Sequence, residues 1–486
     1  MALFQLVGKH YVSQSPVAAN NALINWYTEL IEVETGRSQI ALYPTSGLDQ
    51  ISTSTPTGPG RGAIEINGRY FCVIRSTFYE MSSAGVLTSR GTVSGTSGTV
   101  SMASSATQML ILSNQVGYIY TLATNVLAAI ADLDFPTGGV VAGYTDGYFV
   151  VLSTNGNFYI SALNDGTSWD ALDFDTVSSS ANTIIGMIIH ERMIWIFGDK
   201  LTQPFFNSGN PDFPFEAVQS GTIQQGLGAR FSVTAHGETG TLYWLQAGME
   251  GAGVYVQATG TSVERVSDYS FDTEVAGYTT ISDAIASCFT ENGHMFCMVT
   301  FPTENVTWVY DARMKHWHKR LYWNSSTGEY EAHRALYHVY VFNKHIWLDR
   351  ASGKVYEMKA GSVSGGTGTF NDDDGDVIRR LRRCPHVAAG NKTVFHKSLE
   401  LIMETGLALS TGQGSDPQVM LRISDDGGKN YFMEQSISVG AIGEFTRRVK
   451  WDQLGSARDR VYEIVVTDPV PWRLISAELD AEVGLS

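Results

Sequence analysis

Two histidines in the motif His316-Trp317-His318 are spaced so that they could bind a metal ion. Alternate residues of an extended strand share one side, so both imidazoles would face the same way. A metal site needs at least one further ligand, for which His333 or His338 could serve. A polar strand edge with stacked aromatic rings also explains the motif. We favour that second interpretation and expect no bound metal.

An acidic run and four cysteines are the other possible cation ligands. The run lacks the phase of an EF-hand loop and its final glutamate, so we expect a solvated loop. No cysteine belongs to a CxxC pair, and we expect small buried side chains, with a disulfide or a zinc site as the alternative. The acidic residues are Asp372, Asp373, Asp374 and Asp376, and the cysteines are Cys72, Cys288, Cys297 and Cys384.

The sharpest local motif runs from Ser424 to Tyr431 and reads SDDGGKNY, which fits the Asp-box pattern S-x-D-x-G-x-x-aromatic. In this pattern the aspartate accepts backbone N–H bonds across a hairpin and the aromatic ring covers the turn. We therefore expect Ser424, Asp426, Gly428 and Tyr431 to form a structural hairpin. A sialidase-like glycan hydrolase is a weak alternative, because it would need several such motifs, an arginine cluster and a paired Tyr and Glu.

Six arginines form the dense basic signal of the chain. They could contact acidic partner subunits or DNA phosphates, or they could pair with carboxylates of their own domain. We treat them as a candidate subunit-interface or DNA-facing cluster and leave internal pairing open. The residues are Arg379, Arg380, Arg382, Arg383, Arg447 and Arg448.

Sequence motifs of common enzymes are missing: there is no GxSxG, no P-loop, no GxGxxG opening a helix and no HExxH. Spacing does not single out catalytic carboxylates among the 49 acidic residues. We therefore expect a protein that is not an enzyme and that uses no cofactor.

The elements that position these residues are predicted to be short strands. The 486 residues include 49 glycines, 22 tyrosines and 22 phenylalanines, which is typical of many strands joined by glycine turns. The length favours two or more domains. The first residues lack a signal-peptide pattern, and no apolar run reaches the ~20 residues of a membrane helix. We expect a soluble protein made in a cytoplasm.

The net charge of −16 is unevenly distributed along the chain. Residues 377–486 hold 14 of the 33 basic and 14 of the 49 acidic residues, which leaves 19 basic and 35 acidic residues in 1–376. The first three-quarters therefore carry the whole acidic excess. Such a surface repels phosphate and is poorly suited to gripping DNA.

A repeated unit of short strands occupies the chain from about residue 60. Apolar or aromatic strands begin at residues 70, 109, 148, 193, 242, 295 and 339, so the period lies between 39 and 53 residues. This is the spacing of propeller blades, which bury their faces against one another. Asn-Gly and Asp-Gly turns support hairpins within the units. We predict an all-β protein with a β-propeller of six or seven blades, and an irregular β-sandwich is the alternative.

Four segments are predicted: an N-terminal segment (1–55), the β-propeller (56–360), a linker or long loop of small and acidic residues (361–376), and a separate C-terminal β-sandwich docking domain (377–486). The N-terminal segment holds a helix or long strand at 21–34 and could pack on the ring or on a partner. Strand-like runs separated by Gly, Asp and Pro predict the sandwich. These runs are 394–403, 418–424, 431–436, 445–451 and 462–467.

The C-terminal run LRISDDGGKNYFMEQ, followed by FTRRVKWDQLGSARDRVYEIVVTDPVPWRLISAEL, resembles the end of the packaged-DNA stabilisation, or tail hub (nozzle), proteins of short-tailed bacteriophages. The shared order is an Asp-Gly hairpin before Asn-Tyr, a basic-Val-x-Trp strand, an Arg-rich turn and a Pro-Val element. The rest of the chain is similar to the family in its order of short, aromatic-rich strands. Residues 43–48 resemble an N-terminal turn of the family more weakly, because the usual Pro-Gly order is not kept. The matching positions are Asp426, Gly427, Asn430, Tyr431, Arg448, Val449, Trp451, Gly455, Arg458, Arg460, Val466, Pro469 and Val470.

This resemblance implies a structural virion protein of the phage tail that extends and helps close the portal channel, retains packaged DNA and attaches tail fibres or tailspikes. It implies a ring, commonly a homohexamer, below the portal-adaptor (head-to-tail connector) protein and plugged by a tail needle or tip protein. Double-stranded DNA would pass through it transiently, and assembly would take place in the bacterial host cytoplasm. A receptor- or carbohydrate-binding propeller adhesin, usually trimeric, is the alternative function.

Overall fold

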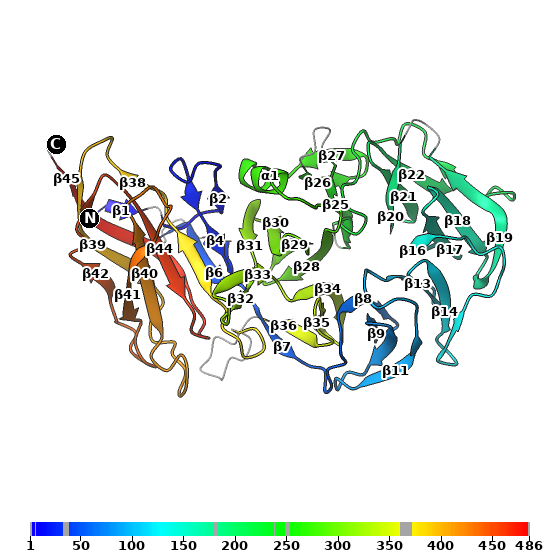
Figure 1. Ribbon diagram of the computed structural model, residues 1–486, viewed down its shortest axis with the longest axis horizontal. Helices are drawn as coiled ribbons and strands as arrows, with labels where there is room; N and C mark the ends of the chain where they lie inside the picture. The colour runs from blue at the N-terminus through cyan, green and yellow to red at the C-terminus, as the bar shows by residue number, and fades with distance from the viewer. Residues whose placement is uncertain are drawn as a thin grey trace.

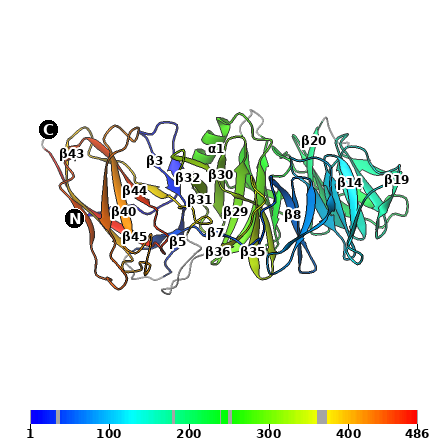
Figure 2. The same ribbon diagram turned by 60° about the horizontal axis from the view of Figure 1, so that its bottom comes forward.

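The computed structural model describes residues 2–4, 6–32, 38–177, 182–237, 239–247, 253–359 and 372–484. These residues form a β-propeller and a β-sandwich that lie next to each other in an elongated molecule, with both chain ends on the sandwich (Figures 1 and 2). The predicted all-β class, with a propeller and a separate sandwich, is confirmed. A short helix, α1 (Tyr269–Ala276), follows the fifth blade. No helix in the described ranges is long and apolar enough to cross a membrane.

The described residues contain seven propeller blades, each with four antiparallel strands. The strands of each blade are given from the inside outwards. The first blade comprises β8 (Gly60–Ile66), β9 (Arg69–Ile74), β10 (Thr77–Met81) and β11 (Leu87–Thr92), and the second comprises β12 (Ser101–Ser104), β13 (Gln108–Ser113), β14 (Val116–Thr121) and β15 (Val126–Ala129). The third comprises β16 (Gly139–Thr145), β17 (Tyr148–Ser153), β18 (Asn157–Ala162) and β19 (Asp165–Thr176). The fourth and fifth are β20 (Ile184–His190), β21 (Met193–Gly198), β22 (Thr202–Asn207) and β23 (Phe215–Ala217); and β24 (Thr234–His236), β25 (Thr241–Gln246), β26 (Val254–Thr259) and β27 (Ser262–Arg265). The sixth and seventh are β28 (Ile285–Glu291), β29 (His294–Phe301), β30 (Val306–Asp311) and β31 (His316–Lys319); and β34 (Ala335–Val341), β35 (Lys344–Asp349), β36 (Val355–Lys359) and β7 (Gly47–Gln50). A hairpin of β32 (Leu321–Asn324) and β33 (Glu329–Ala332) joins these last two blades.

The second strand of a blade is apolar on both faces because each face packs on a different neighbour. In β9, Phe71 and Val73 belong to the core shared with the second blade, whereas Tyr70, Cys72 and Ile74 belong to the core shared with the seventh. The strand follows a hairpin turn in which Asn67 and Gly68 both have positive φ, at 52° and 73°, as a type I′ turn requires. Alternating side chains therefore bury both faces of every blade in a closed ring.

The ring is closed by a strand from the N-terminal segment. Strand β7 pairs antiparallel with β36 at the outer edge of the seventh blade, with Leu48 opposite Met358. The predicted start of the seventh repeat at residue 339 was wrong in phase, because Val339 lies on β34, the inner strand. The other six predicted strands are each the second strand of a blade, and the second strand of the seventh blade is β35.

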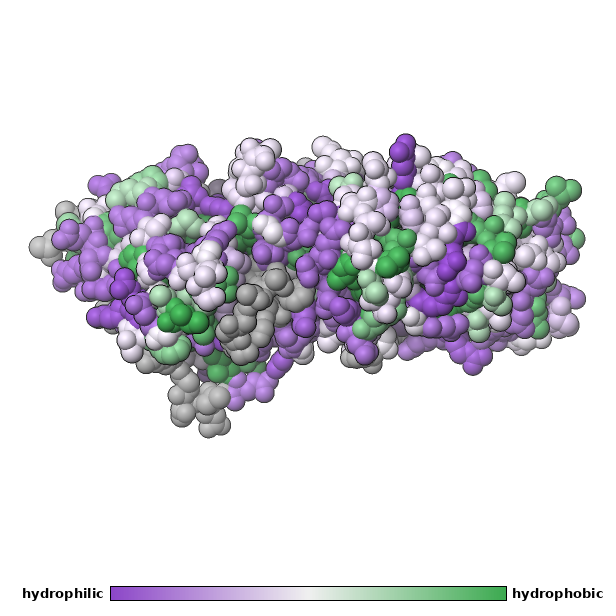
Figure 3. Space-filling model, turned by 90° about the horizontal axis from the view of Figure 1, so that it is seen from below, coloured by the Kyte–Doolittle hydropathy of each residue, from purple (hydrophilic) through white to green (hydrophobic). Residues whose placement is uncertain are grey.

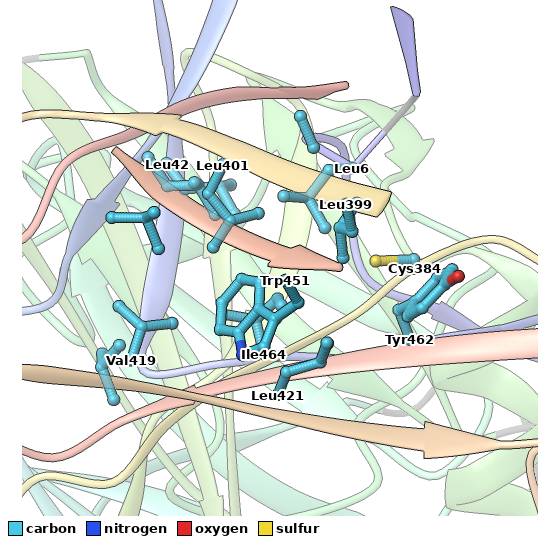
Figure 4. Packing of buried hydrophobic residues seen from close by; sticks show 14 of the residues in the cluster. Leu6, Leu42, Cys384, Leu399, Leu401, Val419, Leu421, Trp451, Tyr462 and Ile464 are labelled. Carbon is cyan, nitrogen blue, oxygen red and sulfur yellow. The ribbon is translucent and has the colours of Figure 1, made fainter. Parts of the chain in front are cut away.

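The sandwich packs two sheets around one apolar core. Leu399 and Leu401 come from one sheet, Leu421 and Ile464 from the other, and Trp451 lies between them (Figure 4). The first sheet comprises β42 (Val449–Asp452), β39 (Val394–Met403), β45 (Leu474–Val483), β6 (Ile40–Pro44) and β5 (Trp26–Leu30), with β1 (Ala2–Phe4) and β43 (Ser456–Ala457) at its sides. The second comprises β4 (Leu23–Ile24), β37 (Arg380–Arg383), β44 (Asp459–Val466), β40 (Gln418–Ser424) and β41 (Phe432–Ser438), with β38 (Val387–Ala388) beside β44. A small pair, β2 (Tyr11–Val12) and β3 (Asn20–Asn21), lies outside both sheets.

One sheet continues from the propeller into the sandwich. Strand β31 of the sixth blade pairs in parallel with β4, where Lys319 lies opposite Ile24. Strand β4 then pairs with β37, where Leu381 lies opposite the same Ile24, and β37 pairs with β44. In Figure 1, β4 lies between β31 and β44. The first fifty-five residues, expected as a separate segment, are thus divided among the sandwich, this junction and the closing blade.

The acidic run was predicted to be a solvated loop, and its described part, residues 372–376, is instead packed against the propeller. Asp373 is 2% exposed and forms a bridge with Leu48 of β7. Asp376 forms an ion pair with Arg334, with 2.6 Å between the carboxylate oxygen and the guanidinium nitrogen, and Asp374 forms one with Lys354. The two ion pairs and the bridge with Leu48 explain why these residues are packed against the propeller instead of being solvated. The remaining linker residues, 361–371, lie outside the described residues.

The preferred prediction for the cysteines was wrong for one pair. Cys288 and Cys297 form a disulfide between β28 and β29, where they lie directly opposite each other. The hairpin turn Asn292-Gly293, with φ of 51° and 78°, sets that register. Cys72 and Cys384 are free and buried, as expected for small apolar side chains.

Candidate interface region around the arginine strand

The arginine strand β37 lies at the junction of the two domains, and Arg382 on it faces inwards. Its side chain is 1% exposed. The guanidinium donates through Nε to the carbonyl of Leu6 at 2.7 Å and through Nη1 to the carbonyl of Lys9 at 3.2 Å. Burial lowers the pKa of Arg382 to about 10. Arg382 therefore fixes the N-terminal segment to the sandwich.

Arg380 lies two residues earlier and is also internal. It is fully buried, and its Nη2 donates to the carbonyl of Thr45 at 3.4 Å. Burial lowers the pKa of Arg380 to about 10, and the charges of Asp373 and Asp372 oppose that shift. Burial in turn raises the pKa of Asp373 to about 7. The opposite charges of the acidic run and the arginine strand therefore offset part of the cost of burying them.

Arg383 belongs to a network centred on a buried carboxylate. Glu463 on β44 is fully buried, and its Oε2 accepts Nε of Arg383 at 2.7 Å while its Oε1 accepts Nη1 of Arg422 at 2.8 Å. The two arginines lie on β37 and β40, the strands on either side of β44, directly opposite Glu463. The ring of Tyr431 covers the pair, with its centre 4.7 Å from the guanidinium carbon of Arg383.

The other three arginines are more accessible. Arg379 stacks on Trp323, with 4.7 Å between guanidinium carbon and ring centre, and donates to the hydroxyl of Tyr330 at 3.0 Å. Arg447 and Arg448 lie far along the chain, before β42, and both are exposed. Arg448 makes a two-pronged ion pair with Glu400 at 2.8 and 2.5 Å.

The six arginines therefore do not form a single basic surface. Arg380 and Arg382 are internal because alternate residues of β37 point into the junction, and this corrects the expectation that they face a partner or DNA. Arg383 is neutralised within its own domain. Of the two exposed arginines, Arg448 pairs with Glu400, whereas Arg447 has no ion-pair partner in the described part of the chain.

The hairpin between β40 and β41 has its aspartate at the centre of the turn. Oδ1 of Asp426 accepts the backbone N–H groups of Lys429 and Asn430, each at 3.0 Å, and the hydroxyl of Ser424 at 2.7 Å. These hydrogen bonds, led by that from the Asn430 backbone, hold the pKa of Asp426 well below its usual value. Gly428 at the turn has φ of 85°, which favours glycine. The motif orders a turn and presents no reactive group.

The histidines weighed as metal ligands are separate from one another. Nδ1 of His316 lies 2.9 Å from Oγ1 of Thr28, and His318 is buried with its pKa lowered by that burial. Burial lowers the pKa of His333 to about 3, and His338 contacts a different histidine, His345, at 3.0 Å. No group of three or more His, Cys, Asp or Glu side chains in the described ranges could hold a metal ion.

Sequence reasoning missed a histidine that links the propeller to β5. His294 is fully buried on β29, with Nδ1 at 2.6 Å from Asp311 and Nε2 at 2.7 Å from Glu29. Burial lowers the pKa of His294, but the hydrogen bonds and charges of Asp311 and Glu29 outweigh it, so the pKa lies above its usual value. His294 and Asp311 lie on neighbouring strands of one blade, but Glu29 comes from β5, far away in the sequence, so no local motif could have indicated the three together.

Exposed apolar side chains near Arg447 were also missed. Ile442 is 57% exposed and Phe445 is 69% exposed, both in the loop that precedes β42. The face of the molecule in Figure 3 is mainly hydrophilic, with hydrophobic residues in small scattered groups. A large exposed aromatic residue next to a cation is typical of protein interfaces. We name residues 440–448 the sandwich loop.

Most of the chain matches one protein family, in two parts that follow each other along the sequence. Residues 6–362 match the bacteriophage P22 Gp10 β-propeller, and residues 379–482 match the bacteriophage P22 Gp10 β-sandwich. The chain therefore belongs to the bacteriophage P22 Gp10 family, whose members are structural components of the virion. This confirms the resemblance found in the C-terminal sequence.

Several solved structures are similar to part of the chain. The extracellular domain of BT4673 from B. thetaiotaomicron has 11% identity and a TM-score of 0.44, over 72% of this chain and 46% of that one, so the match spans about half the length of that domain. The WD40 β-propeller domain of Doa1 has 8% identity and a TM-score of 0.40, over 64% and 97%. BamB from Moraxella catarrhalis has 11% identity and a TM-score of 0.39, over 64% and 98%. No curated protein matches the sequence.

Proposed function

We propose that this chain is a tail hub, or nozzle, of a short-tailed bacteriophage. Copies of it form a ring, in our proposal a homohexamer, below the portal-adaptor protein. The ring extends and helps close the portal channel, retains packaged DNA and carries tail fibres or tailspikes, and a needle or tip protein plugs it. The role is structural and not catalytic, and membership of a phage virion family over both domains supports it.

The observation that carries this proposal is the sheet that runs from the sixth blade into the sandwich. A part that connects a portal to peripheral fibres must keep its two domains in a fixed orientation while DNA leaves. The backbone pairing of Lys319 with Ile24, and of Ile24 with Leu381, crosses the domain boundary. Arg380 and Arg382 are buried at the same boundary and reinforce it.

The charge distribution supports passage of DNA rather than tight binding. Residues 1–376 hold 35 acidic and 19 basic residues, so the propeller repels phosphate. Weak, repulsive walls limit friction on a moving duplex, whereas close phosphate contacts would slow it. The buried arginines of β37 are consistent with this, since they are not available to DNA.

Attachment to neighbouring proteins is assigned to the sandwich loop. Arg447 is exposed and without an ion pair among the described residues, and Phe445, two residues earlier in the chain, is 69% exposed. A cation next to an exposed aromatic ring can pair with an acidic, partly apolar surface. Arg447→Glu should abolish incorporation into tails while leaving the circular dichroism spectrum unchanged. Arg192→Glu is the control, because Arg192 is an exposed arginine on the propeller with an 82% exposed side chain.

The function itself is tested with phage particles that lack this protein. We expect such heads to package DNA, to leak it, and to retain it after purified protein is added, measured as DNase-resistant DNA. Normal retention without the protein would contradict a role in closing the channel. Normal tail incorporation of Arg447→Glu would refute only the docking assignment.

A further inference from the structure

A cavity of about 240 Å³ lies on the propeller axis and is lined by the inner strands of the blades. Its wall includes Gly62 of the first blade, Ser101 of the second, Met187 of the fourth and Tyr337 of the seventh, all on inner strands. Pockets for drug-sized ligands measure roughly 300–1,000 Å³, so this cavity suits a smaller molecule.

Arg230 provides a cation in this cavity without a counterion. It precedes β24 and is half-buried, and its Nε donates to the carbonyl of Ile185 at 2.9 Å. The remaining guanidinium donors have no carboxylate partner in the part of the chain that the structure describes. Burial lowers the pKa of Arg230, and no acidic group compensates. A partly desolvated guanidinium without an ion pair favours binding of an anion.

A second arginine adds to the positive potential behind the cavity wall. Arg61 on β8 is 1% exposed and donates to backbone carbonyls, at 2.8 Å to both Gly98 and Arg75. Its charge also acts on Tyr337, which lines the cavity. No aspartate or glutamate is among the residues that line the cavity in the described part of the chain, although the protein carries a net charge of −16.

The remaining lining combines a few hydroxyls with apolar side chains. The hydroxyls of Tyr337 and Thr99 are hydrogen-bonded to each other at 3.1 Å, so one hydroxyl hydrogen of the pair is left to donate to a ligand oxygen. Met102, Phe231 and Val233 supply apolar surface on the same cavity. A ligand that satisfies both features has one anionic group and a compact apolar body.

We infer that this cavity on the propeller axis binds a carboxylate carried on a small apolar body, with Arg230 as the anion-binding residue and with Met102, Phe231 and Val233 around the apolar part. The terminal residue of a peptide chain and a free acyl amino acid share this chemistry. The inference goes beyond the proposed function and does not depend on it.

The probe is N-acetyl-leucine, titrated calorimetrically into the full-length protein, with N-acetyl-leucinamide as the neutral analogue and inorganic phosphate as an anion without an apolar body. Because Arg230→Gln removes a charge-assisted hydrogen bond to the carboxylate, it should weaken N-acetyl-leucine binding at least tenfold. Arg230→Lys keeps the charge and should bind with intermediate affinity. Arg192→Gln, on an exposed part of the propeller, should bind like the wild type.

Several outcomes would overturn the inference. These are an absence of saturable binding to the wild type, equal binding of the acid and the amide, or equal affinity in Arg230→Gln and the wild type. Phosphate binding tighter than N-acetyl-leucine would refute the apolar component. A peptide ending in leucine and free N-acetyl-leucine distinguish the two sources, because only a chain terminus would gain affinity from added upstream residues.

Discussion

Replacing Glu463 by glutamine should strongly destabilise the sandwich. The side chain of Glu463 is fully buried, whereas those of Arg383 and Arg422, its partners at 2.7 and 2.8 Å, are 29% and 28% exposed. Removing one member of a buried ion pair costs about 3–5 kcal/mol, because a charge is left without compensation. Water can reach part of each arginine, so we expect a loss of about 2–4 kcal/mol in the free energy of unfolding.

The measurement is urea-induced unfolding followed by circular dichroism, with hydrogen exchange of the β44 amides to locate the effect. The matched control is Glu482→Gln, which breaks an exposed ion pair with Lys397 and should have no measurable effect. Adding Arg383→Met to Glu463→Gln should cost less than Arg383→Met alone, because the arginine has then already lost its partner. A change below about 0.5 kcal/mol for Glu463→Gln would refute the assignment of this network as a stabilising element of the sandwich.

Three further sets of substitutions test the packing of the propeller ring and the burial of one histidine, His333. Burial lowers the pKa of His333 to about 3, so the unfolded chain takes up its proton first and stability falls as the pH drops below about 6.5; the melting temperature of His333→Asn should therefore fall less between pH 7.5 and pH 5 than that of the wild type. Gly85→Ala should lower stability by at least about 2 kcal/mol more than Gly68→Ala, because both glycines have positive φ but only a Cβ at Gly85 would clash with the carbonyl of Ile51; equal effects in thermal unfolding would contradict this close approach. Leu48→Ala should cost about 2–5 kcal/mol in urea unfolding, because Leu48 is fully buried in the strand that closes the ring, and a loss of less than 1 kcal/mol would contradict that closure.

The propeller could be predicted from the sequence because its signal is repeated. Each unit buries a short apolar strand on both faces, and the Asn67-Gly68 and Asp146-Gly147 turns have positive φ at both positions, as type I′ hairpins require. The closing strand could not be predicted in the same way. Strand β7 has four residues and no repeat of its own, and its partner β36 lies more than three hundred residues along the chain.

The predictions of site residues failed where the sequence shows which residues are present but not which way their side chains point. A run of arginines is ordinarily solvated, and the burial of Arg380 and Arg382 depends on β4 and the N-terminal segment covering β37. The alternation of residues 380 and 382 was the available signal, since one face of a central strand is internal. The disulfide was also within reach, because Asn292-Gly293 lies midway between Cys288 and Cys297 and sets them opposite each other.

The most direct test of the proposed role is cryo-electron microscopy of the virion in which this chain is a component. The account predicts a closed ring of copies directly below the portal adaptor, with the propeller and sandwich of each copy in the orientation fixed by β31, β4 and β37. Isolated copies at the periphery of the tail, or two domains whose relative orientation varies between copies, would contradict it.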